Sequence, residues 1–119
     1  MDKLIFLVDD TDSILTLASS VLDDDFRVLT MMSAEKMFSL LVKKRPDLIV
    51  LDIEMPDMNG FEAAAKLREN PDWHDIPVIF LTGYIDDTVL TKATSLKVHG
   101  VVDKSEITTT LLTRVNELI

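Results

Sequence analysis

The sequence predicts an α/β fold in which a parallel β-sheet carries helices on both faces. Three observations indicate this class. Short apolar runs alternate with segments whose apolar residues recur at helical spacing, the connections are short, and the runs at Lys3–Val8 and Leu48–Asp52 lack the polar alternation of a half-exposed strand. Strands that alternate with helices pair in parallel through right-handed crossovers. We therefore predict five strand–helix units in one doubly wound sheet.

Strand signals in the first half fall at Lys3–Val8, Phe26–Met31 and Leu48–Asp52. Thr11 or Asp12 is expected to cap the first helix and Ser33 the second. The helices are predicted from apolar residues that share one face: Ile14, Leu17, Ala18, Val21 and Leu22 in the first, and Ala34, Met37, Phe38, Leu41 and Val42 in the second. Lys43–Arg45 place cations at the end of the second helix before Pro46. We expect Met31, Met32 and Met37 to lie in or near the core.

In the second half, Asn59 and Glu62 have the spacing of a capping box, and Pro71 ends the helix that they open. The fourth strand is predicted at Pro77–Thr82 and the fifth at Gly100–Val102. Asp86 and Asp87 cap the fourth helix, and Ser105 is expected to cap the last. The apolar positions of these helices are Ala63, Ala64 and Leu67, then Val89, Leu90, Ala93 and Leu96, then Ile107, Leu111, Val115 and Leu118.

Composition limits the function classes. The 119 residues are 47% hydrophobic, which is enough for a single core and excludes a disordered chain. The formal net charge of −9 repels phosphate backbones and anionic membranes, so we expect no nucleic-acid or membrane partner for this domain. There is no cysteine, hence no disulfide or thiolate metal site, and no apolar run approaches the roughly 20 residues of a membrane span. We expect a cytoplasmic domain.

Polar residues close the predicted strands. Parallel strands deliver their last residues to one edge of the sheet, so Asp9, Asp10, Asp52, Thr82 and Lys104 should converge there. Taken singly, each could be a cap, a turn residue or a solvated side chain. Three neighbouring carboxylates repel one another, however, and need a compensating cation. Lys104 supplies one positive charge, and an all-oxygen site suits Mg²⁺.

The predicted cluster can support phosphoryl transfer. A carboxylate beside a metal ion can attack phosphorus and form an aspartyl-phosphate, and Asp52 on the central strand is the expected acceptor. Lys104 would neutralise charge on the phosphoryl oxygens, and Thr82 would donate a hydrogen bond to one of them. Modified Asp52 would carry about −2 charge, draw Thr82 inward and shift the fourth helix and the neighbouring surface.

These residues resemble the response regulator receiver domain of two-component signalling, the CheY-like family. The motifs are Asp9-Asp10, Asp52 with Met55-Pro56 and Asn59-Gly60, Thr82-Gly83, and Lys104, and together they span the chain. The resemblance implies a flavodoxin-like (βα)5 fold with strand order 2-1-3-4-5.

The resemblance also assigns roles. It implies that Asp10, Asp52 and the backbone carbonyl of Glu54 bind Mg²⁺, that Asp9 holds a metal-bound water, and that Thr82, Gly83 and Lys104 bind the phosphoryl group. A sensor histidine kinase or phosphotransfer protein would be the donor. The response would be read by a downstream output domain or protein at the surface of the fourth helix, the fifth strand and the last helix. A homodimer is compatible with the resemblance.

Four positions are expected to modulate the switch. Ser105 stands where the family commonly has proline, and Val101 where many members have an aromatic reporter. Tyr84 is an alternative reporter or gate. Glu54 adds a carboxylate that can reach the metal or the hydrolytic water, and we predict that Glu54→Ala alters the lifetime of the aspartyl-phosphate.

Two other functions remain open on the sequence. One is a pseudo-receiver that binds partners without phosphorylation, motivated by Ser105 and Val101. The other is an aspartyl-nucleophile phosphatase. The sequence argues against this function, because such enzymes usually carry a second aspartate two residues after the nucleophile, where this chain has Glu54. The leading expectation is a single receiver domain over residues 1–119, either stand-alone or the N-terminal part of a longer regulator. It would not be an enzyme beyond slow autophosphorylation and autodephosphorylation.

Overall fold

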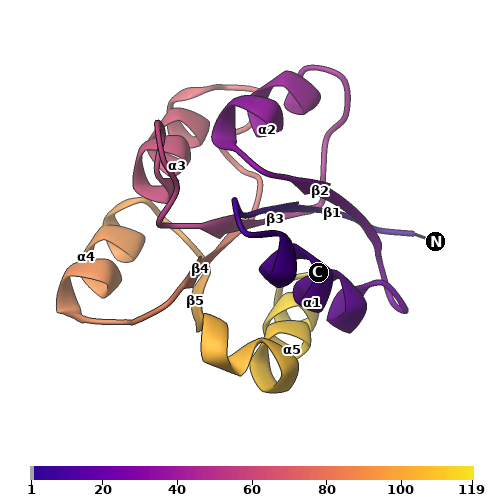
Figure 1. Ribbon diagram of the computed structural model, residues 1–119. Coiled ribbons are helices and arrows are strands. Elements are labelled where there is room, and N and C mark those ends of the chain that lie inside the picture. The colour runs from indigo at the N-terminus through magenta and orange to yellow at the C-terminus, as the bar shows by residue number, and fades with distance from the viewer. Residues whose placement is uncertain (1) are drawn as a thin grey trace.

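A computed structural model describes residues 2–119 as one five-stranded sheet flanked by helices (Figure 1). All pairings are parallel and the strand order is β2-β1-β3-β4-β5, as predicted. The strands are β1 Leu4–Val8, β2 Arg27–Met31, β3 Leu48–Asp52, β4 Val78–Thr82 and β5 Gly100–Asp103. The α-helices are α1 Asp12–Leu22, α2 Ala34–Leu41, α3 Gly60–Glu69, α4 Asp87–Ser95 and α5 Leu112–Leu118.

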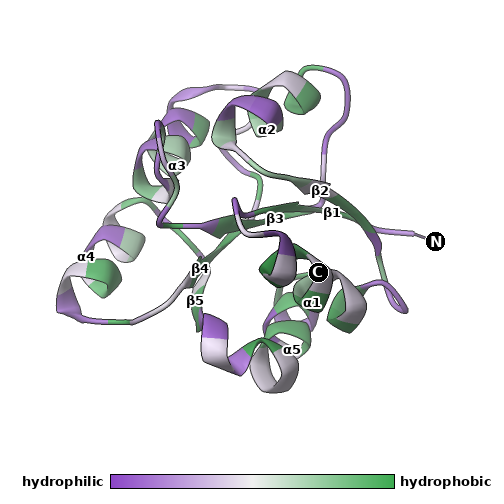
Figure 2. Ribbon diagram, viewed as in Figure 1, coloured by the Kyte–Doolittle hydropathy of each residue, from purple (hydrophilic) through white to green (hydrophobic). Residues whose placement is uncertain are grey.

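Two hydrophobic clusters lie on opposite faces of the sheet. Alternate strand residues point to opposite faces, so Phe6 and Ile49 join α2, α3 and α4, whereas Ile5 and Val50 join α1 and α5. Strands β1, β3 and β4 are buried along their whole length, while the edge strand β2 is partly exposed. Figure 2 shows this as hydrophobic central strands beneath helices of mixed character. The unbroken apolar runs in the sequence therefore mark the strands covered on both sides.

Three of the expected helix caps are present. The Ser33 hydroxyl accepts a hydrogen bond from the Lys36 amide, and the Asp86 carboxylate accepts one from Val89. Asn59 and Glu62 form the reciprocal capping box at the start of α3. Each cap satisfies an amide that the first helical turn leaves free.

The first helix begins at the predicted N-cap residue but without a side-chain cap, and the predicted cap of the last helix is wrong. Thr11 occupies the N-cap position of α1 without a side-chain hydrogen bond, and Asp9 Oδ1 accepts from the Thr11 amide at 2.8 Å instead. Ser105 lies inside a 3-10 turn that Asp103 caps, and its amide and hydroxyl both donate hydrogen bonds to the Asp103 carboxylate. The chain passes through a 3-10 turn at Lys104–Glu106 and a π-helical turn at Ile107–Leu111 before α5.

Four residues predicted to be buried are exposed: Leu17, Met32, Val42 and Leu90. In α1, Leu15 occupies the core position, and a residue two places on lies on another side of the helix. At the end of α2, Leu41 occupies the buried position, and the next residue, Val42, lies on the solvent side. The remaining apolar positions predicted for the helices are buried or partly buried.

Arg68 of α3 ties the end of α4 to the chain that precedes β4. Its guanidinium donates to the carbonyl oxygens of Leu96 and Lys97 at 2.9 and 3.2 Å, and to those of His74 and Ile76 at 3.2 and 3.1 Å. Lys97 has a positive φ of 57° and ends the helix. The carboxyl end of α4 is therefore anchored, while its amino end follows the loop after Thr82. No helix within residues 2–119 has the length and apolarity to cross a membrane.

Candidate functional site

The strand register places the acids beside one another. Val8 pairs with Leu51, so the next residues on these two strands, Asp9 and Asp52, lie side by side at the edge of the sheet. Asp9 and Asp52 are completely buried and Asp10 is partly exposed. One carboxylate oxygen from each of the three lies within 4.8 Å of the others. The structure thus brings together the three acids that end or follow the neighbouring strands β1 and β3.

Lys104 enters this cluster from the end of β5. Its ammonium nitrogen lies 3.1 Å from Asp52 Oδ1 and 3.3 Å from Asp9 Oδ2. Burial, followed by the charge of Asp9, raises the pKa of Asp52 to about 7, although Lys104 opposes the shift. Burial lowers the pKa of Lys104, but its contacts with Asp52 and Asp9 outweigh burial and raise it. One ammonium therefore balances the clustered carboxylates only in part.

Two buried oxygens of the cluster have no hydrogen-bond partner. Among the side chains of residues 2–119 these are Asp9 Oδ2 and Asp52 Oδ2. Asp9 Oδ2 faces the ammonium of Lys104, whereas Asp52 Oδ2 has neither a hydrogen bond nor an ion pair. A buried charged oxygen without a partner is costly. Since all the donors are oxygens and one remains free, the residues fit a hard divalent cation such as Mg²⁺.

Thr82 lies at the same edge, fully buried, but its hydroxyl is directed to Glu54. Thr82 Oγ1 is 3.0 and 3.2 Å from the two carboxylate oxygens of Glu54 and 3.0 Å from the carbonyl oxygen of Tyr84. The Gly83 amide is 3.5 Å from Glu54 Oε1. The contact between Glu54 and Thr82 was not predicted, because the two residues lie 28 positions apart and meet only through the length of the glutamate side chain.

The other positions singled out in the sequence surround the cluster. The Tyr84 side chain is exposed, and Val101 packs at the margin of the core beneath α4. The Ser105 amide and hydroxyl donate to Asp103 Oδ1 at 2.8 and 2.7 Å and close a turn around Lys104. These two hydrogen bonds lower the pKa of Asp103. The roles predicted for these residues remain predictions.

Gly60 allows a close contact between the start of α3 and the end of β3, which the Asn59-Gly60 motif alone did not predict. A Cβ atom at this position would lie 2.4 Å from the carbonyl oxygen of Asp52 and 2.8 Å from the Cα of Ile53. The Gly60 amide also donates to the carbonyl oxygen of Ile53 at 2.9 Å. Only glycine therefore lets the start of α3 approach the end of β3 this closely.

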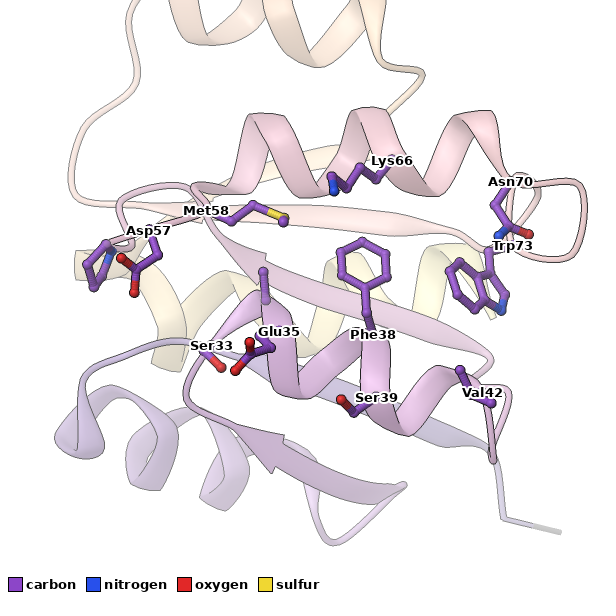
Figure 3. Close-up of a pocket in the computed structure, with 12 residues that line it drawn as sticks. Ser33, Glu35, Phe38, Ser39, Val42, Asp57, Met58, Lys66, Asn70 and Trp73 are labelled. Carbon is purple, nitrogen blue, oxygen red and sulfur yellow. The ribbon is translucent and has the colours of Figure 1, made fainter.

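A hollow of about 840 Å³ lies between α2 and α3, away from the clustered acids (Figure 3). Phe38 and Trp73 lie side by side there, with ring centroids 5.6 Å apart. Trp73 therefore packs against the domain's own surface. The chemistry of the sheet edge does not extend into this groove, whose lining contains none of the three clustered acids.

Comparisons with known proteins agree with this arrangement. The response regulator receiver domain model matches residues 5–116. The chemotaxis protein CheY4 of Vibrio cholerae is 25% identical and superposes with a TM-score of 0.93 over 100% of both chains. The BeF3-activated receiver domain of DrrB, a protein of Thermotoga maritima, is 29% identical, with a TM-score of 0.88 over 99% of this chain and 97% of that one.

Protein RcaC of Microchaete diplosiphon is 36% identical over 92 residues, which are 77% of this chain and 14% of that protein. The chain therefore spans a small part of this longer relative. Neither a phosphatase nor a pseudo-receiver is favoured by these matches. The parallel sheet, the acidic edge and the family match over residues 5–116 show that the chain belongs to the response regulator receiver domain family, the phosphoacceptor module of two-component signalling.

Proposed function

We propose that Asp52 is the phosphoacceptor of this receiver domain. The observation that carries the proposal is the free, fully buried Oδ2 of Asp52, with Lys104 held on Oδ1. A carboxylate oxygen of Asp52 attacks the phosphorus of a phosphohistidine, the P–N bond breaks, and the imidazole leaves with the electron pair. The donor is a sensor histidine kinase or a phosphotransfer protein.

The neighbouring residues hold the metal and the transferred group. Asp10, Asp52 and the carbonyl oxygen of Glu54 would hold Mg²⁺, with Asp9 acting through a water molecule, and the ion would neutralise charge on the phosphoryl oxygens. Lys104 contacts one phosphoryl oxygen, and the Thr82 hydroxyl and the Gly83 amide approach others.

The response is read at the surface formed by α4, β5 and α5. Movement of Thr82 pulls the loop that leads into α4, while Arg68 anchors the other end of that helix. The reader is a downstream output domain or protein, or a second copy of the chain. We propose that residues 1–119 form a single receiver domain, stand-alone or N-terminal in a longer regulator. It would act in the cytoplasm with only slow autophosphorylation and autodephosphorylation.

Incubation with acetyl phosphate and Mg²⁺, followed by mass spectrometry of the intact protein, tests the proposal. The protein should gain one phosphoryl group that hydroxylamine removes, and EDTA should prevent the gain. Asp52→Asn should take up none. Asp57→Asn is a matched control, because Asp57 is an exposed acid of the same loop and its positive φ of 67° suits asparagine. Uptake by Asp52→Asn equal to that of the control would disprove the assignment.

A further inference from the structure

We propose that Glu54 is a positioning residue that holds the Thr82 hydroxyl in the resting state and competes with the phosphoryl group for it. The inference rests on the proposed role of Asp52. It differs from the expectation that Glu54 reaches the metal or the hydrolytic water, because the carboxylate acts here through Thr82.

The geometry of the contact is well defined on both sides. Both oxygens of Glu54 lie within hydrogen-bond distance of Thr82 Oγ1, at 3.0 and 3.2 Å. The Glu54 amide donates to Asp52 Oδ1 at 3.2 Å, which fixes the backbone of Glu54 on the acceptor residue. Glu54 therefore links the acceptor strand to the end of β4 before any phosphoryl group is present.

The Thr82 hydroxyl has one proton and several acceptors. It can donate to Glu54 or to the Tyr84 carbonyl oxygen, which lies 3.0 Å away, but not to both. The ionised carboxylate is the stronger acceptor. A phosphoryl group on Asp52 adds charged oxygens as rivals, so Thr82 can bind them only after it leaves Glu54. The hydrogen bond from Thr82 to Glu54 is thus lost when the switch closes.

Glu54 also opposes the phosphoryl group through its charge, since both are anionic. The charge repulsion by Glu54 and its hydrogen bond with Thr82 can be measured separately, because only the hydrogen bond requires the Thr82 hydroxyl. The hydrogen bond from Thr82 to the charged carboxylate of Glu54 is weakened because Glu54 is exposed. Its loss on binding should lower the affinity of the site for a phosphoryl mimic about tenfold.

The test is a double-mutant cycle on binding of beryllofluoride with Mg²⁺, which mimics the phosphoryl group. Dissociation constants are measured by NMR titration for the wild type, Glu54→Ala, Thr82→Ala and the double variant. Glu54→Ala should tighten binding about tenfold more when Thr82 is present than in the Thr82→Ala background. Thr82→Ser keeps the hydroxyl and should restore the larger effect. Glu69→Ala, which removes an exposed acid of α3, should leave binding unchanged.

The resting state gives a second readout. Without beryllofluoride, Glu54→Ala should change the Thr82 methyl shift and side-chain rotamer, and Glu54→Gln, whose amide oxygen still accepts, should change them less. If Glu54→Ala tightened beryllofluoride binding equally with Thr82 present and in the Thr82→Ala background, Glu54 would act through charge repulsion alone, and the inference would be overturned. Absence of beryllofluoride binding in every variant, together with no uptake from acetyl phosphate, would instead overturn the role of Asp52.

Discussion

Replacing Asp52 with asparagine is expected to stabilise the metal-free protein at neutral and alkaline pH. Burial and the charge of Asp9 raise the pKa of Asp52 from 3.8 to about 7. A carboxyl whose pKa is raised by folding binds more protons in the folded state than in the unfolded state between these values. The fold therefore keeps its full stability at acid pH, where Asp52 is protonated in both states, and loses stability as the pH rises from about 4 through about 7.

The size of the effect follows from the same pKa. A difference of one in pKa corresponds to about 1.4 kcal/mol, so ionised Asp52 lowers the free energy of unfolding by at most about 4 kcal/mol at about pH 8. Asparagine removes the charge but keeps an oxygen that can accept from Lys104 and from the Glu54 amide. The gain from Asp52→Asn should thus be close to zero at about pH 4 and largest at about pH 8.

Urea unfolding in EDTA across this pH range measures the gain. Asp24→Asn is the matched control, because Asp24 is exposed and its substitution makes the same change in net charge. Added Mg²⁺ should stabilise the wild type more than Asp52→Asn and narrow the difference. A gain that does not vary with pH, or a loss of stability in Asp52→Asn at about pH 8, would refute the argument from burial.

Other substitutions test the residues that support the site. Gly60→Ala should lower the free energy of unfolding by about 1–3 kcal/mol in urea melts, because its Cβ would strike the end of β3, while Gly83→Ala, with open space around it, should change stability little. Arg68→Met should cost about 2 kcal/mol and raise amide hydrogen exchange in the last turn of α4, since several carbonyl oxygens lose a charged donor; unchanged exchange would contradict the anchor. Asp103→Ala opens the turn made with Ser105, so it should lower the free energy of unfolding slightly and slow uptake from acetyl phosphate by the folded protein, and an unchanged rate would show that Lys104 needs no such support.

The sequence predicted the sheet and the clustered acids because both depend on chain direction. An unbroken apolar run is a strand covered on two sides, and parallel strands end at the same edge wherever they lie in the chain. Asp9, Asp52 and Lys104 could therefore be placed together without knowledge of any side-chain rotamer. The exposed positions of Leu17 and Leu90 could not be predicted, because apolar neighbours compete for one helix face and the packing of the sheet decides between them.

Contacts that depend on the length and conformation of a side chain could not be predicted from the sequence either. Asp9 looked like a site residue and Thr11 like a cap, yet Asp9 also accepts the Thr11 amide, so one carboxylate serves the helix start and the cluster. Gly60 could be recognised as part of a motif, but its reason is the close approach of α3 to β3. The partner of Glu54 required the distance between a loop and the end of β4.

The balance of charge connects these observations. Three acids meet at the sheet edge, and the one ammonium that contacts them satisfies the buried pair Asp9 and Asp52 incompletely, since Asp52 Oδ2 keeps no partner. Glu54 lies beside them, and its carboxylate is already held by Thr82. In the resting site, the negative charge of the clustered acids is therefore only partly neutralised, and the Thr82 hydroxyl is hydrogen-bonded to Glu54 and not to a phosphoryl group. A divalent cation neutralises the remaining charge, whereas only a group that outcompetes Glu54 for the Thr82 proton closes the switch, so metal binding alone should leave α4 in its resting position.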